Sequence, residues 1–238
     1  MMPVTLTGPD LSQYRREEIL RDGSRVLLRT IDKSDVPLWL AFISRLSTHA
    51  KYLRFHNIPK EMTEEDAIRY CTVDYIKSFA YIAEIGKKKG RKIIAVARYS
   101  RLPDKRSAEV AFAIEDAYQS IGLGTKLIEA LVNVARENDI STFEADVLGQ
   151  NLKMMEAFRD YGFHVSSNLE DGVYHVTFPI KQTRIMDKKE ASRDRTAIIA
   201  SLQPILNPKS VAIIGAARHI GTIGNLLMRC ILQSGFSD

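Results

Sequence analysis

The segment from Gln119 to Thr125 is the part of the sequence whose residue types could bind a ligand most directly. It reads Gln-Ser-Ile-Gly-Leu-Gly-Thr and stands between a strand-like and a helix-like segment. Gly122 and Gly124 let the backbone come close to a ligand and turn several N–H groups toward one point. A helix that begins directly behind adds the positive end of its dipole. The segment can therefore hold a phosphate or pyrophosphate, although its spacing alone also suits a simple turn before a helix.

Two common phosphate-binding patterns are excluded here. A Walker loop requires Gly-Lys-Ser/Thr, which does not follow. The dinucleotide-binding fingerprint requires a third glycine, which is missing at this position.

The elements around this loop can be predicted from turn signals and from the spacing of apolar residues. An Asp-Gly turn at 22–23 indicates a hairpin, and Gly162 is a natural residue just beyond a helix. The expected strands are 19–20, 25–29, 79–85, 92–99, 109–114, 142–147, 163–165 and 173–178. The expected helices are 32–46, one opening at 63–66, 122–137 and 151–161. This order predicts a mixed α/β domain that ends near Ile180.

Composition divides the chain into four parts. Residues 1–20 are expected to be an N-terminal arm, and residues 21–180 the α/β domain. Residues 181–206 are expected to be a charged linker, since 181–195 is polar and poor in large apolar residues, followed by a short helix at 198–206. Residues 207–238 contain a buried-strand pattern at 211–214, a glycine turn and a helix at 225–233.

The bulk composition limits the class of protein. The chain has 238 residues, 45% of them hydrophobic and 26% charged, as in soluble globular domains. Its net charge of +5 is small and its charged residues are interspersed, which argues against a nucleic-acid partner. Two distant cysteines and five scattered histidines match neither a disulfide framework nor a metal site. Without a long apolar run or a secretion signal, we expect no membrane partner and a cytoplasmic location.

The loop and the elements around it together resemble a known family. Gln-X-X-Gly-X-Gly between a strand and a long helix resembles the acyl-CoA-binding motif of GNAT acetyltransferases. The downstream part of the family pattern is matched by Asn151, Met154, Phe158 and Tyr161-Gly162-Phe163. Four segments resemble, more narrowly, the bacterial protein lysine acetyltransferases that silence acyl-CoA synthetases: 47–55, 96–99, 108–112 and 151–163. The resemblance covers about residues 20–180.

The resemblance implies an acetyl-CoA-dependent N-acetyltransferase of the GNAT fold, with no metal. Its mostly antiparallel sheet is flanked by helices and splayed between the fourth and fifth strands, with the pantetheine arm of CoA in the gap. Backbone N–H groups of 121–125 would bind the pyrophosphate, and Asn151 would face the arm. The full set expected to contact acetyl-CoA is Phe112, Ala113, Ile114, Gln119, Ser120, Ile121, Gly122, Leu123, Gly124, Thr125, Asn151, Met154 and Phe158. A purely core role is the alternative for Met154.

Glu109 is the residue to which the resemblance gives the role of general base. A lysine amine is almost fully protonated at pH 7, so a carboxylate at the acceptor mouth can take its proton during attack. Strand alternation puts Glu109 on the same side as Ala111 and Ala113, whose small side chains leave room beside it. From the residue alone, an exposed charge at a strand end is the alternative interpretation.

No general acid is assigned. Many GNAT enzymes protonate the departing thiolate with a tyrosine at the position where this chain has Phe158. Tyr161 lies directly before Gly162 and is expected to face another way.

The resemblance implies transfer of the acetyl group to the ε-amine of a protein lysine, on acyl-CoA synthetases, by direct attack. Two alternatives stay open: a small-molecule amine as acceptor, which a deep acidic pocket would indicate, and a non-catalytic acyl-CoA sensor. Residues 207–238, with Gly215, Gly221 and Gly224, resemble the start of the CoA-binding domain of NDP-forming acyl-CoA synthetases. We therefore expect a truncated Rossmann-like stub, and fusion to such a synthetase in a longer protein.

Overall fold

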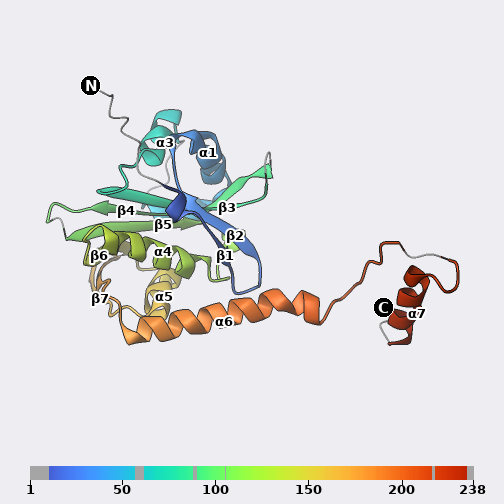
Figure 1. The fold of residues 1–238 in the computed structure, drawn as a ribbon. Coiled ribbons are helices and arrows are strands. Elements are labelled where there is room, and N and C mark those ends of the chain that lie inside the picture. Colours follow the sequence, from blue (N-terminus) through green and yellow to red (C-terminus); the bar gives the residue numbers. More distant parts are fainter. Residues whose placement is uncertain (1–10, 57–61, 88–89, 105, 216–217, 235–238) are drawn as a thin grey trace, which may run out of the picture.

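The computed structural model describes residues 11–56, 62–87, 90–104, 106–215 and 218–234, in which eight strands form one sheet flanked by helices (Figure 1). The strands are β1 (Arg16–Ile19), β2 (Arg25–Thr30), β3 (Ser78–Ile85), β4 (Lys92–Arg101), β5 (Ser107–Ile114), β6 (Thr142–Leu148), β7 (Ser166–Glu170) and β8 (Val173–Pro179). The α-helices are α1 (Val36–Arg45), α2 (Thr48–Phe55), α3 (Glu64–Cys71), α4 (Leu123–Glu137), α5 (Leu152–Tyr161), α6 (Arg184–Leu206) and α7 (Ile223–Gln233).

The strand order is β1-β2-β3-β4-β5-β6-β8-β7, and only β5 and β6 pair in parallel. The predicted mostly antiparallel sheet is thus confirmed. The parallel ladder holds from Ser107–Thr142 to Glu109–Glu144, after which the two strands separate. This is the expected splay. It falls between the fifth and sixth strands in chain order, because the hairpin adds β1 at the edge of the sheet.

Two apolar cores, one on each face, fix the helices to the sheet. On one face, α1, α2 and α3 pack through a core that includes Trp39, Phe42 and Ile93. On the other, α4 and α5 pack through a core that includes Leu127 and Phe158. Figure 1 shows α1 and α3 above the sheet and α4 and α5 below it.

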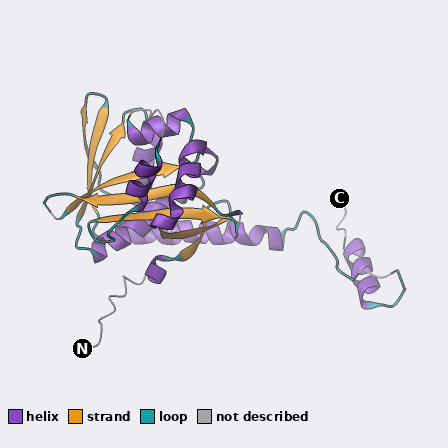
Figure 2. Cartoon of the chain, turned by 90° about the horizontal axis from the view of Figure 1, so that it is seen from above, coloured by secondary structure: helices purple, strands orange, loops and turns teal. Residues whose placement is uncertain are grey.

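The C-terminal strands leave one face of the sheet open. Along β6, Phe143, Ala145 and Val147 are buried toward the helices, whereas Asp146 between them is exposed. Along β8, His175 is likewise exposed between less exposed neighbours. Seen from above, the helices that precede β3 lie over only part of the sheet (Figure 2). A face of exposed side chains on β6, β8 and β7 therefore continues from the splayed strands.

Several turns and helix ends lie where the sequence predicted them. Gly23 turns the hairpin with a φ of +83°, in the left-handed region that favours glycine. Thr63 and Asp66 form a capping box at the start of α3. Gly162 ends α5 with a φ of +109°.

The chain differs from the expected elements at three places. An additional helix, α2, forms over 48–55, capped by the Ser47 side chain. The last hairpin begins at Ser166 rather than 163, because Phe163 is buried against Tyr161 and Phe178 instead of pairing in the sheet. The expected arm already contains β1, although its residues 1–10 lie outside the described part of the chain, as do Lys88 and Lys89 of the expected turn between β3 and β4.

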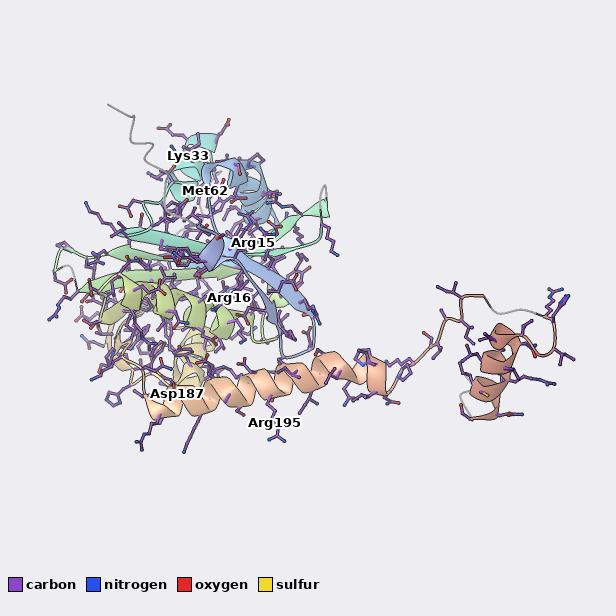
Figure 3. The ribbon with its side chains drawn as sticks, in the orientation of Figure 1. Arg15, Arg16, Lys33, Met62, Asp187 and Arg195 are labelled. Carbon is purple, nitrogen blue, oxygen red and sulfur yellow. The ribbon has the colours of Figure 1, made fainter. Side chains whose placement is uncertain are left out.

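The expected linker at 181–195 was wrong, because residues 184–195 form the first half of α6. The Thr183 side chain caps this helix, and its many Lys, Arg, Glu and Ala residues are good helix formers. Met186 and Ala197 are buried where α6 crosses the domain below α4 and α5 (Figure 1). The polar residues that had indicated a linker lie on the solvent-exposed face of this helix. Arg195 projects from that face (Figure 3).

The expected strand at 211–214 is also absent from the described residues, although the helix after it forms as α7. Ile214 is 98% exposed and no residue of α7 is buried, so this segment has no apolar surface on which to pack. Residues 216–217 and 235–238 of the expected Rossmann-like stub lie outside the described residues. None of the helices in the described ranges is long and apolar enough to cross a membrane.

A buried ionic cluster holds α6 against α4 and β1. Lys126 Nζ lies 2.6 Å from Asp194 Oδ1 and 3.1 Å from Glu18 Oε2. Glu129 is nearly enclosed, and its Oε2 accepts no hydrogen bond, being 3.8 Å from Lys126 Nζ. Burial raises the pKa of Glu129 to about 7, although the charge of Lys126 opposes the shift.

Glu129 therefore predicts a pH-dependent stability. Its folded-state pKa of about 7 lies above the ordinary 4.5, so its contribution is full below about pH 4.5 and is lost as the pH rises through 7. Glu129→Gln keeps this side chain neutral and should raise the free energy of unfolding at pH 8 by about 1–3 kcal/mol, with a much smaller effect at pH 5. Urea unfolding at both pH values measures the difference.

Glu17→Gln, at an exposed position on β1, is the control and should change stability little at either pH. A loss of stability at pH 8 in Glu129→Gln would show instead that Lys126 requires the charged carboxylate.

Candidate active-site cleft

The separation of β5 from β6 opens a cleft of about 280 Å³ in the sheet. Its walls come from the parting strands, from the C-terminal end of α2 and from the start of α5. Five residues singled out from the sequence border this one cleft: Glu109, Phe112, Asn151, Met154 and Phe158.

Glu109 occupies the last paired position before the gap. It lies opposite Ser100 on β4 and Glu144 on β6, and its side chain is exposed. Ala111, two residues on, also borders the cleft, and its methyl group leaves space beside the carboxylate. The carboxylate is therefore both accessible and at the point where the strands part.

Asn151 and Phe158 fix α5 against the cleft. Asn151 caps α5, since its Oδ1 accepts a hydrogen bond from the Met154 N–H at 3.3 Å. The Phe158 ring is 1% exposed and lies 6.2 Å from the Phe112 ring and 4.6 Å from the Phe178 ring. It is an apolar floor of the cleft and has no group that could donate a proton.

Tyr161 does not replace the missing tyrosine. It is buried on α5 against Phe163, where the guanidinium of Arg193 lies over its ring. Burial raises its pKa to about 12. It does not border the cleft, in agreement with the expectation that it faces another way.

The loop after β5 presents a run of free backbone donors. Among the described residues, the N–H groups of 120–125 have no hydrogen-bond acceptor, and the N–H of Lys126 is the first to bond within the helix. Ser120 and Gly122 have φ of +64° and +90°, which turns the chain sharply before α4. The first N–H groups of a helix point outward along its axis, so this loop is suited to an anion.

Side chains of the loop serve to hold it in place. Gln119 Nε2 donates to the carbonyl of Ile114 at 3.1 Å, and Lys153 Nζ on α5 donates to Gln119 Oε1 at 3.3 Å. The Arg21 N–H donates to the carbonyl of Ile121 at 2.9 Å, which ties the hairpin to the loop. Leu123 and Thr125 are buried, so their side chains are not presented to a ligand.

Gly124 lies close to the end of β5. A Cβ at this position would meet Ile114 Cδ1 at 3.3 Å, so a side chain here would require the Ile114 side chain to shift by a few tenths of an ångström. Ala113 and Ile114 are half-buried there and do not border the cleft itself. The structure thus divides the sequence-predicted residues between the cleft and the loop at the end of β5.

A second, smaller cavity of about 170 Å³ lies on the other side of the loop, against α6. Its lining includes Gly122, Arg21 and Lys126. Lys126 is already paired with carboxylates there, so this cavity is less suited to binding an anion than the free N–H groups are. Within the described residues, no group of three or more His, Cys, Asp or Glu side chains could hold a metal ion.

Several cleft residues were missed by the sequence reasoning. They are Leu53 and His56 at the end of α2, Tyr70 on α3, and Asp146 on β6. Arg54 and Phe55 also border the cleft. Both lie in the 47–55 segment that resembles the family, but no chemical role was predicted for them. The helical spacing of 48–55 was the signal that could have placed α2 beside β5.

Comparisons with known proteins agree with this geometry. The model of the acetyltransferase (GNAT) family matches residues 46–163. An acetyltransferase of Pseudomonas aeruginosa is 31% identical over 121 residues, which cover 51% of this chain and 65% of that protein. The acetyltransferase Pat of Mycolicibacterium smegmatis is 31% identical over 137 residues, covering 57% of this chain and 40% of Pat. The chain therefore spans less than two thirds of the length of these curated relatives.

A solved structure gives a fuller match. The crystal structure of the GNAT domain of S. lividans PAT shares 31% identity with this chain, at a TM-score of 0.66. The similarity covers 73% of this chain and 99% of that domain.

The loop geometry predicts the effect of a side chain at Gly122. At a φ of +90°, alanine is disfavoured by roughly 1 kcal/mol or more, so Gly122→Ala should distort the turn that aims the N–H groups. We expect acetyl-CoA to bind about tenfold more weakly, as measured by isothermal titration calorimetry.

Gly172→Ala is the matched control, because Gly172 also has a positive φ, of +80°, but lies in the β7–β8 turn. It should lower the melting temperature to a similar extent while acetyl-CoA affinity stays the same. Equal losses of affinity in the two variants would mean that strain, rather than the loop, is responsible.

Proposed function

Because this chain belongs to the acetyltransferase (GNAT) family, we propose that it transfers an acetyl group from acetyl-CoA to the ε-amine of a protein lysine. The observation that carries the proposal is the position of Glu109, at the point where β5 and β6 separate. The free N–H groups of 120–125 lie at the other end of the same strand.

The cosubstrate fits this arrangement in two places. The pyrophosphate of CoA is an anion that the free N–H groups after β5 can bind. The unpaired edges of β5 and β6 offer backbone donors and acceptors to the amides of the pantetheine arm. Acetyl-CoA bound in this way presents its thioester carbonyl toward Glu109.

The chemistry needs a neutral amine. The lysine nitrogen attacks the thioester carbon, the C–N bond forms, and the C–S bond breaks to release the CoA thiolate. In the proposed mechanism the carboxylate of Glu109 takes the proton that the amine loses. The thiolate is protonated by solvent, since Phe158 occupies the position of the usual acid.

The open face beside the cleft supports a protein acceptor. A small amine is usually enclosed by a deep pocket, whereas here the Glu109 end of the cleft continues into the exposed face of β6 and β8. The similarity to the Pat acetyltransferases points the same way. We propose acyl-CoA synthetases as the acceptors, following the resemblance of the segments at 47–55 and 108–112.

The proposal also includes the C-terminal segment, as part of a partner module. Residues 207–238 resemble the first strand and helix of a CoA-binding domain. Val211 and Ile214 are exposed and pair with no strand of the described residues.

Glu109→Gln tests the proposed base. The amide keeps the shape of the side chain but cannot take a proton, so we expect kcat to fall by about 10²–10⁴ while acetyl-CoA still binds. Release of CoA thiol in the presence of acceptor measures the rate. Mass spectrometry of a lysate incubated with labelled acetyl-CoA identifies the modified lysines.

Glu144→Gln removes the neighbouring carboxylate on β6 and should change the rate only about threefold or less. Near-wild-type turnover in Glu109→Gln would exclude Glu109 as the base. Binding of acetyl-CoA by the wild type without transfer to any lysate protein would favour a sensor over an enzyme.

A further inference from the structure

Two arginines, one that borders the cleft and one on the strand beside it, have no carboxylate partner among the described residues. Arg54 lies in the last turn of α2 and Arg98 on β4, and both are half-buried. We call them the guanidinium pair. Arg29, another half-buried arginine, differs from them because it forms ion pairs with Asp35 at 2.6 Å and with Glu84 at 2.8 Å.

Within the described residues, the guanidinium pair makes no hydrogen bond and no ion pair. Its contacts are with aromatic rings. The Arg98 guanidinium carbon lies 5.2 Å from the centre of the Tyr70 ring, and that of Arg54 lies 5.0 Å from the centre of the Phe55 ring. Aromatic faces attract a cation but leave its N–H donors free.

The electrostatic environment is unfavourable for both cations. Burial lowers the pKa of Arg98 and of Arg54, and repulsion between the two adds to the shift at Arg54. The charge of Glu109 attracts both, but it does not lie within ion-pair distance of either. A cation that has lost its water without gaining a charged partner favours the binding of an anion.

The position of the pair excludes the CoA pyrophosphate as that anion. Helix α2 runs along β5, and its N-cap Ser47 donates to Asp116 at 2.8 Å, just before the loop of free N–H groups. Arg54 is at the other end of this eight-residue helix, about 12 Å away, where it borders the cleft with Glu109.

Arg98 is placed at the same end by the sheet register. It lies directly opposite Ala111, and Ser100 lies opposite Glu109. Arg98 and Glu109 are therefore diagonal neighbours on one face of the sheet. The guanidinium pair and the proposed base face the same acceptor.

We infer that Arg54 and Arg98 form an anion subsite for the acceptor, which binds the carboxylate of an Asp or Glu side chain close to the target lysine. The inference rests on the proposed lysine acetyltransferase function. The planar fork of a guanidinium matches a carboxylate with two parallel hydrogen bonds. An acceptor bound this way directs its lysine toward Glu109 and its acidic neighbour toward α2 and β4.

The test uses pairs of peptides, each with one lysine. Each pair differs only in having Glu or Gln at one position within two residues of the lysine. We expect the wild-type chain to acetylate the best Glu peptide with a kcat/KM about tenfold or more above that of its Gln twin. In the double variant Arg54→Gln/Arg98→Gln this ratio should fall to about one.

Arg69→Gln is the matched control. Arg69 also lies over the Tyr70 ring, at 5.8 Å, but its side chain is 75% exposed and outside the cleft. This variant should keep the wild-type ratio. Melting temperatures establish that the variants are folded, and Arg54→Gln alone should already lower the ratio if the double variant does not fold.

Equal rates for Glu and Gln peptides with the wild type would overturn the subsite while leaving lysine acetylation intact. A preference that survives in the double variant would overturn it as well. Binding of acetyl-CoA without transfer to any peptide or lysate protein would instead overturn lysine acetylation, and the subsite with it.

Discussion

Strands β5 and β6 share hydrogen bonds only as far as Glu109 and Glu144, and this break in the middle of the sheet has to be stabilised from outside the ladder. Backbone N–H and C=O groups along the gap lack strand partners, which is tolerable only where water or a ligand can reach them. The aromatic core below the gap joins the two halves. Phe158 on α5 touches both Phe112 on β5 and Phe178 on β8. Its apolar ring therefore packs the two halves of the sheet together and also forms the floor of the cleft.

The two ends of β5 differ in chemistry because they are built by different parts of the chain. At one end the donors are backbone N–H groups, which carry no side-chain entropy and are aimed by the turn at Gly122. At the other end the groups are side chains: the carboxylate of Glu109 and the cations of the guanidinium pair. Helix α2 connects the two, since Ser47 bonds to Asp116 near the loop and Arg54 borders the cleft near Glu109. The rigidity of one short helix thus fixes how far the proposed acceptor site lies from the loop of free N–H groups.

Much of the fold could be predicted because it follows local rules. The Asp-Gly hairpin, the capping box at Thr63 and the glycine after α5 each have a single-residue cause. The gathering of Glu109, Phe112 and Asn151 at one cleft followed from the family resemblance, since the residues alone do not show that two strands will separate. What could not be predicted depends on tertiary packing. Phe163 packs in the aromatic core instead of pairing in the sheet. Val211 and Ile214 are exposed, and 211–214 forms no strand.

Helix α6 shows most clearly why composition was an insufficient guide. It buries only Met186 and Ala197, so its sequence has the polarity of a linker. It is held mainly by charged contacts: Lys126 with Asp194, and Lys189 Nζ, which donates to the Arg159 carbonyl at 2.7 Å near the end of α5. Cations at that end suit the unsatisfied carbonyls and the helix dipole of α5. Further along, the backbone of α6 at Ala200 lies against Gly23 in the turn of the β1–β2 hairpin. Two residues before Gly23, the Arg21 N–H donates to the Ile121 carbonyl and so holds the loop. Helix α6 thus supports both α5, which borders the cleft, and the loop at the end of β5, and it is packed against the domain.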